Sequence, residues 1–394
     1  MDHPILRPEI QEFIDAKVGS DVKALALLKN PFPDVRWIDI LDQISAKTKA
    51  QAKLPTWFKT SNIIYPSKLS VEQTSSERTA EYKARLVSGH SLIDLTGGFG
   101  VDDFYFSKKV GTVVHCEIDA ELSEIVKHNL STLQVQNIVC LQGDSAGVLA
   151  ASDQKYDWIY IDPSRRNETK GKVFMLKDCS PDVPRLLDLY FTKSDHILIK
   201  TAPLLDLSAG MAELRHVRKI HIVALNNEVR ELLWELSAGY SGEIEIDTVN
   251  LTKSDEQYFS FKPDAAYHAV IGLPKRYLYE PNSAIMKSGG FNAIAEKFKL
   301  TKLHLHSHLY TADEILPFPG RVFEVTGVIP YEKQAMRKLI ENRQCNISVR
   351  NFPETAEVIR KKWKIKDGGE TYCVFTTNAD NRKIVLICAK ITPP

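Results

Sequence analysis

The chain has 394 residues, a length that favours two or three domains over a single hydrophobic core. It is 43% hydrophobic and 26% charged with a formal net charge of +1, so no global charge drives it toward nucleic acid or membrane and any basic surface must be local. No stretch reaches the roughly 18 apolar residues of a membrane helix, and the N-terminus lacks the pattern of a signal peptide, which together predict a cytoplasmic protein.

Residues 1–88 predict an N-terminal helical module. Ser70 and Gln73 resemble a capping box that opens a helix toward Leu86. Three earlier segments carry apolar residues at three- and four-residue spacing, namely Glu9–Val18, Asp21–Lys29 and Trp37–Lys49. Prolines between these segments mark turns, because proline breaks helix propagation.

Residues 89–273 change to short apolar runs separated by helical patterns, which is typical of βαβ units and a parallel sheet. The six candidate strands are Ser91–Leu95, Thr112–Glu117, Ile138–Gln142, Trp158–Ile161, His196–Lys200 and Ile220–Leu225. Further strands are expected at Ile244–Leu251, Tyr258–Phe261 and Ala266–Gly272, with an antiparallel pair that could close the sheet edge. The fold class is therefore predicted as α/β.

Residues 278–394 predict a small α+β domain, and Pro274–Asn282 is interpreted as the linker before it. A helix is expected near Phe291–Phe298. The later elements are a strand Arg321–Ile329, a helix Tyr331–Glu341, a strand Asn346–Arg350, a helix Pro353–Lys361 and strands Thr371–Thr377 and Lys383–Ile391. The order β-α-β-α-β-β favours a ferredoxin-like sandwich.

A glycine-rich loop follows the first predicted strand and leads into the helical stretch Val101–Lys109. The loop consists of Asp94, Leu95, Thr96, Gly97, Gly98, Phe99 and Gly100. Glycines let the backbone approach a ligand that a Cβ would exclude, and the next helix supplies free amides. A nucleotide-like ligand fits this place, although strand-loop-helix turns with glycine are common.

Acidic side chains follow the next two predicted strands. Glu117 stands 23 positions after Asp94, near the offset at which an acid accepts hydrogen bonds from ribose hydroxyls, and Ile118 comes next. Asp144 and then Ser145 follow the third strand, where a carboxylate could accept from an adenine amino group, although Gly-Asp is also an ordinary turn. Open α/β sheets bind ligands at the carboxyl ends of their strands, so the coincidence favours a cofactor site.

This constellation, with Asp162-Pro163 after the fourth strand, resembles the class I S-adenosylmethionine-dependent methyltransferases. The resemblance implies a Rossmann-like sheet and S-adenosylmethionine as cofactor. The implied cofactor residues are Asp94, Thr96, Gly97, Gly98, Phe99, Gly100, Asp102, Glu117, Ile118, Asp144 and Ser145. Thr96 replaces the first glycine of the usual pattern, a form that resembles those of some RNA methyltransferases.

A nicotinamide dinucleotide enzyme is the main alternative. Its fingerprint needs a small residue three positions after Gly100, where the sequence has Asp103. A carboxylate beside a pyrophosphate would oppose the attraction of the helix dipole for anions. S-adenosylmethionine has no phosphate and carries positive groups, so it tolerates Asp102 or Asp103.

The candidate catalytic residues are Asp162, Pro163, Ser164 and Arg165. They resemble the Asn/Asp-Pro-Pro-aromatic motif of methyltransferases that act on exocyclic or amide nitrogens. The resemblance implies that the acid and a backbone carbonyl accept hydrogen bonds from the amine and orient its lone pair, which is catalysis by positioning. Arg165 replaces the aromatic residue, so its guanidinium could stack on a base or hold a phosphate. A strand-ending turn with a solvated basic loop is the plain alternative.

Three further segments could complete this crevice, and one of them is Asn226–Glu228 after the sixth strand. Asn167–Pro184 could cover the substrate, and Lys200–Pro203 could line the same space after the fifth strand. Each of these segments is individually more typical of a structural role. No metal is expected, because the six cysteines are spread singly and His304-x-His306-x-His308 has no carboxylate or cysteine spaced to complete a site.

The positive charge concentrates in residues 278–394, which hold 18 Lys and Arg against 12 Asp and Glu. Arg360–Lys366 interleaves cations with Trp363, which could contact phosphates and stack on RNA bases, or could be a solvated helix end. Arg350–Pro353 and Lys366–Gly369 resemble the THUMP-like, ferredoxin-like C-terminal domain of a family of bacterial methyltransferases. By analogy of fold, a THUMP-like domain implies RNA delivery.

The sequence therefore predicts an S-adenosylmethionine-dependent enzyme that methylates a nitrogen of a structured RNA. Two alternatives stay open. One is an RNA-binding protein whose methyltransferase fold is inactive, and the other is a methyltransferase that acts on a protein or a small molecule. The sequence carries no signal for an oligomeric state.

Overall fold

The computed structural model describes residues 3–66, 71–165 and 175–391. Its contacts divide the chain into two compact units, the first formed by 1–218 and 233–241 and the second by 219–232 and 242–394. The first unit holds the N-terminal helices and most of the parallel strands, and the second holds the C-terminal domain. The three predicted domain boundaries remain predictions.

Helices form the N-terminal part of the first unit, as predicted. They are η1 (Pro4–Leu6), α1 (Pro8–Ala16), α2 (Val22–Ala26), α3 (Trp37–Lys53), α4 (Pro55–Lys59) and α5 (Glu77–Ala84). The apolar faces of α1 and α3 pack together through Ile10, Ile14, Ile40 and Ile44. Helix α5 begins at Glu77 because Ser76 caps it, whereas the predicted cap at Ser70 lies outside the described residues.

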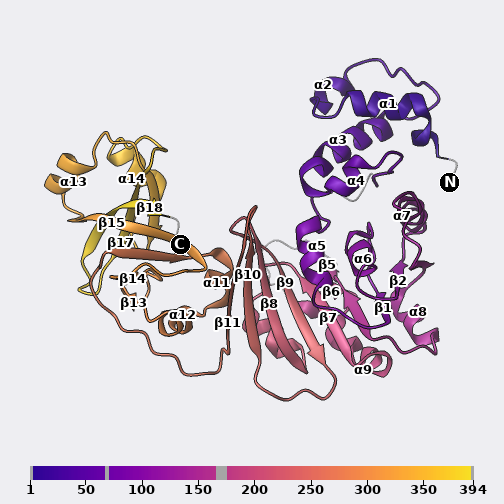
Figure 1. Cartoon of the computed structure of the whole chain (residues 1–394). Coiled ribbons are helices and arrows are strands. Elements are labelled where there is room, and N and C mark those ends of the chain that lie inside the picture. The colour runs from indigo at the N-terminus through magenta and orange to yellow at the C-terminus, as the bar shows by residue number, and fades with distance from the viewer. Residues whose placement is uncertain (1–2, 67–70, 166–174, 392–394) are drawn as a thin grey trace. The chain divides into compact units, whose positions relative to one another are not determined.

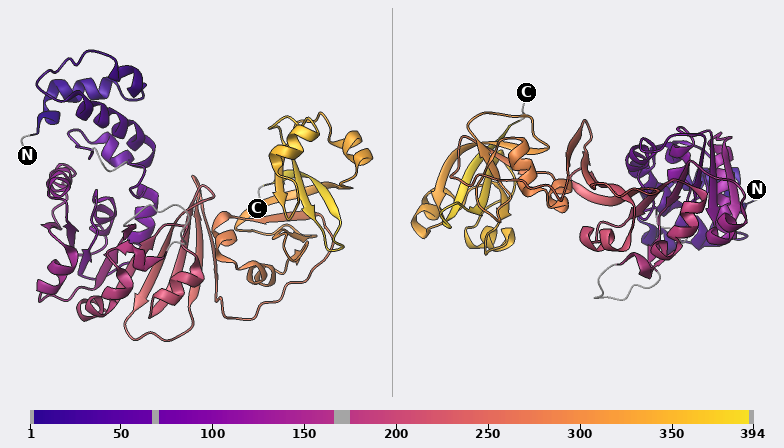
Figure 2. Two further views of the ribbon diagram at one scale, coloured as in Figure 1. Left: turned by 180° about the vertical axis from the view of Figure 1, so that it is seen from behind. Right: turned by 90° about the horizontal axis from the view of Figure 1, so that it is seen from below.

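The strands of the first unit form a parallel sheet. They are β1 (Ser91–Asp94), β2 (Thr112–Glu117), β3 (Ile138–Gln142), β4 (Trp158–Ile161) and β7 (His196–Thr201), in the order β3-β2-β1-β4-β7. The connecting helices are α6 (Val101–Phe106), α7 (Ala120–Thr132), α8 (Ser145–Ala151), α9 (Val183–Lys193) and α10 (Leu207–Glu213). Figures 1 and 2 show α6 and α7 on one side of the strands and α8 and α9 on the other. The carboxyl ends of parallel strands meet at one edge, which brings the predicted site residues together.

Strand β9 (Glu228–Ser237) is missing from the predicted strands. It follows β8 (Val217–Leu225) through a two-residue turn in which Asn226 and Asn227 both have positive φ, at 51° and 66°. Asparagine tolerates this conformation, and such turns join antiparallel hairpins. Both strands have residues in each unit, and β9 adjoins β7 in the first unit.

The second unit contains the edge pair that the sequence predicts. Strand β10 (Glu245–Leu251) pairs in parallel with β8 and antiparallel with β11 (Glu256–Phe261). The expected strand Ala266–Gly272 does not form, since only Ile271 makes an isolated bridge there. The antiparallel pair β10–β11 therefore closes the edge of the sheet, and the additional strand is absent.

The C-terminal domain of the second unit has a seven-stranded sheet in the order β13-β14-β12-β15-β18-β17-β16. Its elements are β12 (Tyr277–Pro281), α11 (Ser283–Ser288), α12 (Phe291–Lys297), β13 (Thr301–Lys302), β14 (Tyr310–Ala312), β15 (Gly320–Pro330), α13 (Lys333–Leu339), β16 (Asn346–Arg350), α14 (Ala356–Lys362), β17 (Thr371–Thr377) and β18 (Lys383–Ile391). The predicted order from β15 onward is confirmed. The interpretation of Pro274–Asn282 as a linker is wrong, because Leu278 and Tyr279 are fully buried in β12.

Trp363 is a core residue and not the stacking surface that the sequence suggested. Its ring packs among Met336, Ile359 and Phe375, and its Nε1 donates a hydrogen bond of 3.1 Å to the hydroxyl of Tyr331. Two of the neighbouring cations are engaged, Arg360 by Asp367 and Lys362 by Glu354. The other cations of this segment, Lys361, Lys364 and Lys366, are exposed.

We expect Trp363→Ala to lower the free energy of unfolding by about 3–5 kcal/mol, because it removes a large buried ring from a packed core. Urea unfolding followed by circular dichroism measures the change. Lys361→Ala, an exposed position on the same helix, should change it by less than about 0.5 kcal/mol. A stable Trp363→Ala variant that binds RNA more weakly would instead support the stacking interpretation.

Candidate functional site

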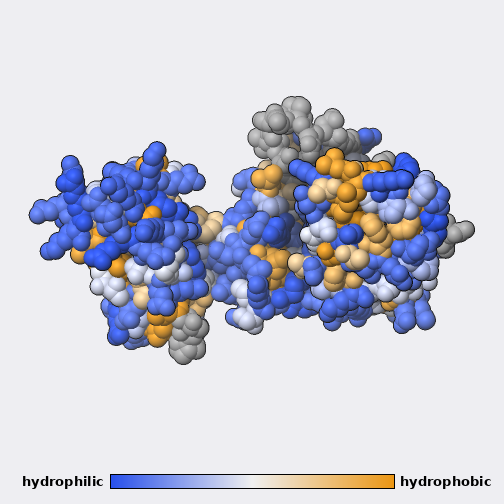
Figure 3. All heavy atoms as spheres, turned by 90° about the horizontal axis from the view of Figure 1, so that it is seen from above, coloured by the Kyte–Doolittle hydropathy of each residue, from blue (hydrophilic) through white to orange (hydrophobic). Residues whose placement is uncertain are grey.

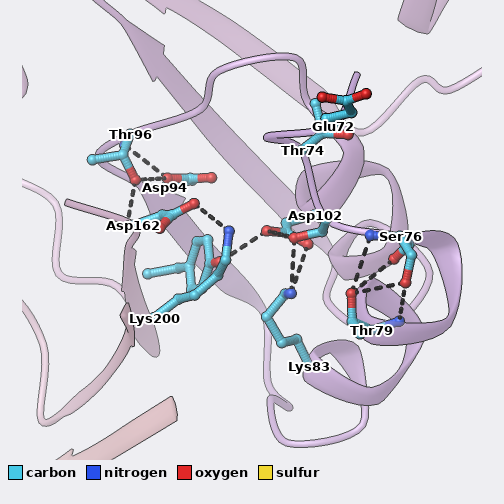
Figure 4. Close-up of polar contacts among 12 residues, drawn as sticks. Glu72, Thr74, Ser76, Thr79, Lys83, Asp94, Thr96, Asp102, Asp162 and Lys200 are labelled. Carbon is cyan, nitrogen blue, oxygen red and sulfur yellow. Dashed lines mark hydrogen bonds and ion pairs between the residues drawn. The ribbon is translucent and has the colours of Figure 1, made fainter. Parts of the chain in front are cut away.

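The tips of β1 and β4 are joined by one side chain. Asp94, buried at the end of β1, accepts hydrogen bonds from the backbone N–H of Thr96 at 2.7 Å and from its hydroxyl at 3.0 Å. The same hydroxyl accepts the backbone N–H of Asp162 at 2.7 Å, and Figure 4 shows Thr96 connected to both Asp94 and Asp162. A glycine could not make this bridge, which explains the threonine at this position of the loop.

The glycines of the loop allow a close approach on one side and leave space on the other. A Cβ at Gly97 would lie 2.2 Å from the ring of His115, so no larger residue fits. Gly98 has φ +57°, and a Cβ there would meet only the carbonyl oxygen of Thr96 at 3.6 Å. Gly100 caps α6, and Phe99 turns inward to pack against Trp57 and Tyr65. The backbone at Gly98 is thus the part of the loop left open to a ligand.

Glu117 is held in place by the loop it faces. Its two carboxylate oxygens accept the backbone N–H groups of Gly98 at 3.0 Å and Asp119 at 2.8 Å. A carboxylate has about four lone-pair sites, so a fixed Glu117 can still accept two more hydrogen bonds. The side chain of Ile118 beside it is 68% exposed.

Asp144 lies exposed between β3 and α8 and acts as the helix cap. Its carboxylate accepts the backbone N–H of Gly147 at 2.9 Å, and Ser145 is the first residue of α8. One lone pair of Asp144 thus stabilises the helix, as in the plain turn interpretation. The remaining lone pairs are available to a donor such as an amino group.

Asp102, predicted near the cofactor, belongs to a buried network that the sequence does not reveal. It accepts the hydroxyls of Ser75 at 2.9 Å and Tyr160 at 2.8 Å, and it pairs with the fully buried ammonium of Lys83 at 3.2 Å (Figure 4). Burial alone would raise the pKa of Asp102, but Lys83, Lys200 and these hydrogen bonds hold it below its ordinary value. The N-terminal helix α5 therefore supplies the charge that keeps this carboxylate ionised.

The sequence predicts Asp103 at the start of the helix, beside the place of a bound pyrophosphate. The structure places its side chain elsewhere. It is fully buried, and its carboxylate is 2.5 Å from Nδ1 of His115 behind the glycine loop. Burial and Asp102 raise the pKa of Asp103 well above its ordinary value, while burial lowers that of His115. Both shifts favour the uncharged forms, and the pair is a buried structural contact behind the loop.

The four predicted catalytic residues follow β4 directly. Asp162 is partly exposed and forms an ion pair with Lys200 of β7, Pro163 is buried, and Ser164 is exposed. Ser164–Arg165 form the short strand β5, which pairs with β6 (Cys179–Ser180). The side chain of Arg165 and residues 166–174, which include Arg166 and much of the expected covering segment, lie outside the described residues.

Lys200 is the ion-pair partner of Asp162. The sequence predicts only that Lys200–Pro203 could line the crevice. The Lys200 ammonium contacts Oδ2 of Asp162, and within residues 3–66, 71–165 and 175–391 no group bonds to Oδ1, which can accept another donor. A hydrogen-bond acceptor with a fixed orientation at a strand tip is suited to hold an N–H group. The acceptors Glu117, Asp144 and Asp162 thus lie at the same edge of the sheet as the glycine loop.

The three histidines His304, His306 and His308 do not converge on a metal. His304 bonds to Asn351 and Asn381, while His308 stacks on Phe291 with ring centroids 3.5 Å apart. Among the residues that the structure describes, no group of three His, Cys, Asp or Glu could hold a metal ion. Within the same residues, no helix is both long and apolar enough to cross a bilayer.

Comparisons with known proteins cover nearly the whole chain. A family model described as a ferredoxin-like domain matches residues 277–319, and one described as THUMP domain-like matches residues 320–390. The crystal structure of a protein assigned as a methyltransferase from Porphyromonas gingivalis W83 is 31% identical, covers 98% of both chains and has a TM-score of 0.87. An uncharacterized S-adenosylmethionine-dependent methyltransferase of Mycobacterium tuberculosis is 24% identical over 311 residues, which are 78% of this chain and 83% of that protein.

We expect Lys83→Met to lower the free energy of unfolding by about 3–5 kcal/mol at neutral pH, because it leaves Asp102 buried without its ammonium. The folded pKa of Asp102 lies below the unfolded value of about 3.9, so the contribution of the pair is present above that pH and is lost as the pH falls through the folded pKa. The difference between variant and wild type should therefore shrink below about pH 4.

Denaturant titrations at several pH values measure this difference. Lys49→Met is the matched control, because it breaks the exposed pair with Glu72 and should cost less than about 1 kcal/mol. A Lys83→Met variant as stable as the Lys49→Met variant would show that the buried pair contributes nothing.

Proposed function

Because this chain belongs to the S-adenosylmethionine-dependent methyltransferases that carry a ferredoxin-like and THUMP-like C-terminal domain, we propose that it methylates a nitrogen of a structured RNA. The observation that carries the proposal is Asp162, which Thr96 and Lys200 fix in place, while no residue that the structure describes bonds to its second carboxylate oxygen. Asp162 stands at the strand tip next to the glycine loop, which is where an acceptor for a substrate amine is needed.

The polar groups around the loop suit an adenosine group without phosphates. Glu117 and Asp144 offer acceptors for ribose hydroxyls and for an amino group, and the exposed Ile118 offers an apolar contact for a base. The backbone N–H of Gly98 already donates to Glu117 at 3.0 Å, so it is not available to a phosphate in the way that the amides of a dinucleotide-binding loop are. We assign cofactor contact to Gly98, Glu117, Ile118 and Asp144, and support of the loop to Asp94, Thr96, Gly97 and Gly100.

When bound, S-adenosylmethionine supplies an activated methyl group. Asp162 accepts a hydrogen bond from the substrate N–H, and the carbonyl oxygen of Asp162 or Pro163 can accept a second. These two bonds hold the amine so that its lone pair points toward the methyl group, which lowers the barrier by orientation. Lys200 contacts the Asp162 carboxylate and fixes its orientation, and is therefore a positioning residue.

The charge of the C-terminal domain supports RNA as the substrate. That domain holds 18 Lys and Arg against 12 Asp and Glu within residues 278–394, and the face of the second unit that Figure 3 shows is mostly hydrophilic. Lys361, Lys364 and Lys366 are exposed and can contact phosphates. Acting on a protein or a small molecule would leave this charge unexplained.

We expect RNA from cells that lack the gene to accept more labelled methyl than RNA from wild-type cells, since the wild-type RNA is already modified. Tritium transfer from S-adenosylmethionine measures this, and nucleoside mass spectrometry identifies the product. Equal incorporation into both RNA pools would count against RNA as the substrate. Substrate binding that does not weaken with salt would favour a protein or small molecule instead.

Asp162→Ala separates an active enzyme from an inactive methyltransferase fold. It should lower transfer by about 100-fold or more, because the substrate amine loses its orientation, while the dissociation constant for the cofactor stays nearly unchanged. Asp153→Ala, an exposed acid between α8 and β4, should leave transfer unchanged. Cofactor binding with no transfer by the wild type would support the inactive alternative.

A further inference from the structure

The second unit contains a pocket of about 550 Å³ that the proposed methyl transfer does not use. Its walls come from the end of β11, the start of α12, β13 and the segment between β13 and β14 (Figure 1). The side chains that matter here are Phe261, Tyr267, Phe291, Lys302, His306 and His308. The volume lies within the range of small-molecule sites, which is about 300–1,000 Å³.

Lys302 is a buried cation without a buried anion to match it. The residue is 2% exposed, and the contacts of its ammonium with the described residues are a long hydrogen bond of 3.5 Å to Asn292 and the Phe291 ring at 5.7 Å. Within residues 3–66, 71–165 and 175–391, no carboxylate forms an ion pair with it. An ammonium in this position is costly unless a negative group compensates it, so the pocket favours an anionic ligand.

Aromatic rings make up much of the remaining wall. His308 stacks on Phe291 with an interplanar angle of 20°, and Phe261 meets Tyr267 edge to face at 6.4 Å. Burial, with the charges of Lys302, His306 and Arg350, lowers the pKa of His308 to about 4, so its ring is neutral at physiological pH. These rings offer flat apolar surface beside a positive charge.

Among the described residues, no acidic side chain lines the pocket. The neighbouring carboxylate of Glu296 is outside the wall and accepts the backbone N–H of His268 at 2.7 Å. Gly290 lets the Phe261 ring approach the backbone, since a Cβ there would lie 2.7 Å from it. A site with one buried cation, several rings and no acid is selective for a ligand that joins a negative charge to a planar ring, as a nucleotide does.

We propose that this pocket binds one unpaired nucleotide of the RNA substrate, with a phosphate oxygen on the Lys302 ammonium and the base against the aromatic wall. The RNA part of this inference rests on the proposed function. A free mononucleotide carries the same chemistry, so the experiment must separate the two sources. Such a site would position the RNA through a nucleotide other than the one that receives the methyl group.

The test uses the full chain in phosphate-free, low-salt buffer. Fluorescence anisotropy measures binding of a labelled single-stranded oligoribonucleotide of mixed sequence, and calorimetry measures binding of AMP and UMP. Lys302→Met should weaken oligoribonucleotide binding by about tenfold or more, the scale of a lost charged hydrogen bond. Lys299→Met is the matched control, because it removes an exposed cation three residues away that does not line the pocket, and it should weaken binding by less than about threefold.

Thermal melting shows that the variant is folded. Lys302→Met replaces an uncompensated buried charge with an apolar chain of similar length, so its melting temperature should equal or exceed that of the wild type. Equal oligoribonucleotide affinity of Lys302→Met and wild type would overturn the proposal, whatever methyl transfer is observed. Lys302-dependent binding of AMP or UMP alone would overturn the RNA part. An absence of methyl transfer to RNA would contradict the proposed function, while the binding data would still decide the pocket.

Discussion

The hydroxyl of Thr96 is the contact on which the candidate site depends. It donates to Asp94 at the tip of β1 and accepts from the backbone of Asp162 at the tip of β4, and thereby fixes the distance between the glycine loop and the acid after β4. A parallel sheet places these tips next to each other, but the sheet alone does not fix the loop conformation. Cofactor contact and substrate contact are thus held by one hydrogen-bonded unit.

Buried charge beneath this unit makes the N-terminal helices part of the same structure. Lys83 of α5 pairs with Asp102 of α6, and Ser75 before α5 donates to the same carboxylate. Phe99 of the glycine loop packs on Trp57 and Tyr65 of the N-terminal part. The helices that precede the sheet therefore pack against the glycine loop and its following helix, and they stabilise the conformation of the loop.

The sequence predicts those parts of the fold that local periodicity and turn chemistry determine. Parallel strands such as β4 are buried on both faces and appear as continuous apolar runs, so the sequence predicts them, as it predicts the order of elements from β15 onward. Strand β9 was missed although the Asn226-Asn227 turn before it is a hairpin signal. Strand β12 was missed because prolines at 274 and 281 resemble a linker.

Side-chain direction could not be predicted in the same way. Glu117, Asp144 and Asp162 follow strands, so the sheet itself brings them to one edge. Asp102 and Asp103 are adjacent on a helix, yet one faces Lys83 and the other faces His115. Trp363 is surrounded by lysines in sequence but buried in space. Partners such as Lys83 and Lys200 are distant in the chain, and no local pattern marks them.

Calorimetric titration with S-adenosylmethionine tests the central claim, that acids at consecutive strand tips hold an adenosine group. Glu117→Ala should raise the dissociation constant for S-adenosylmethionine about 10- to 100-fold, the scale of one lost charge-assisted hydrogen bond to ribose. Glu117→Gln keeps an acceptor oxygen and should raise the dissociation constant less. Glu124→Ala, on the exposed face of α7, should leave it unchanged. Wild-type affinity in Glu117→Ala would contradict the account.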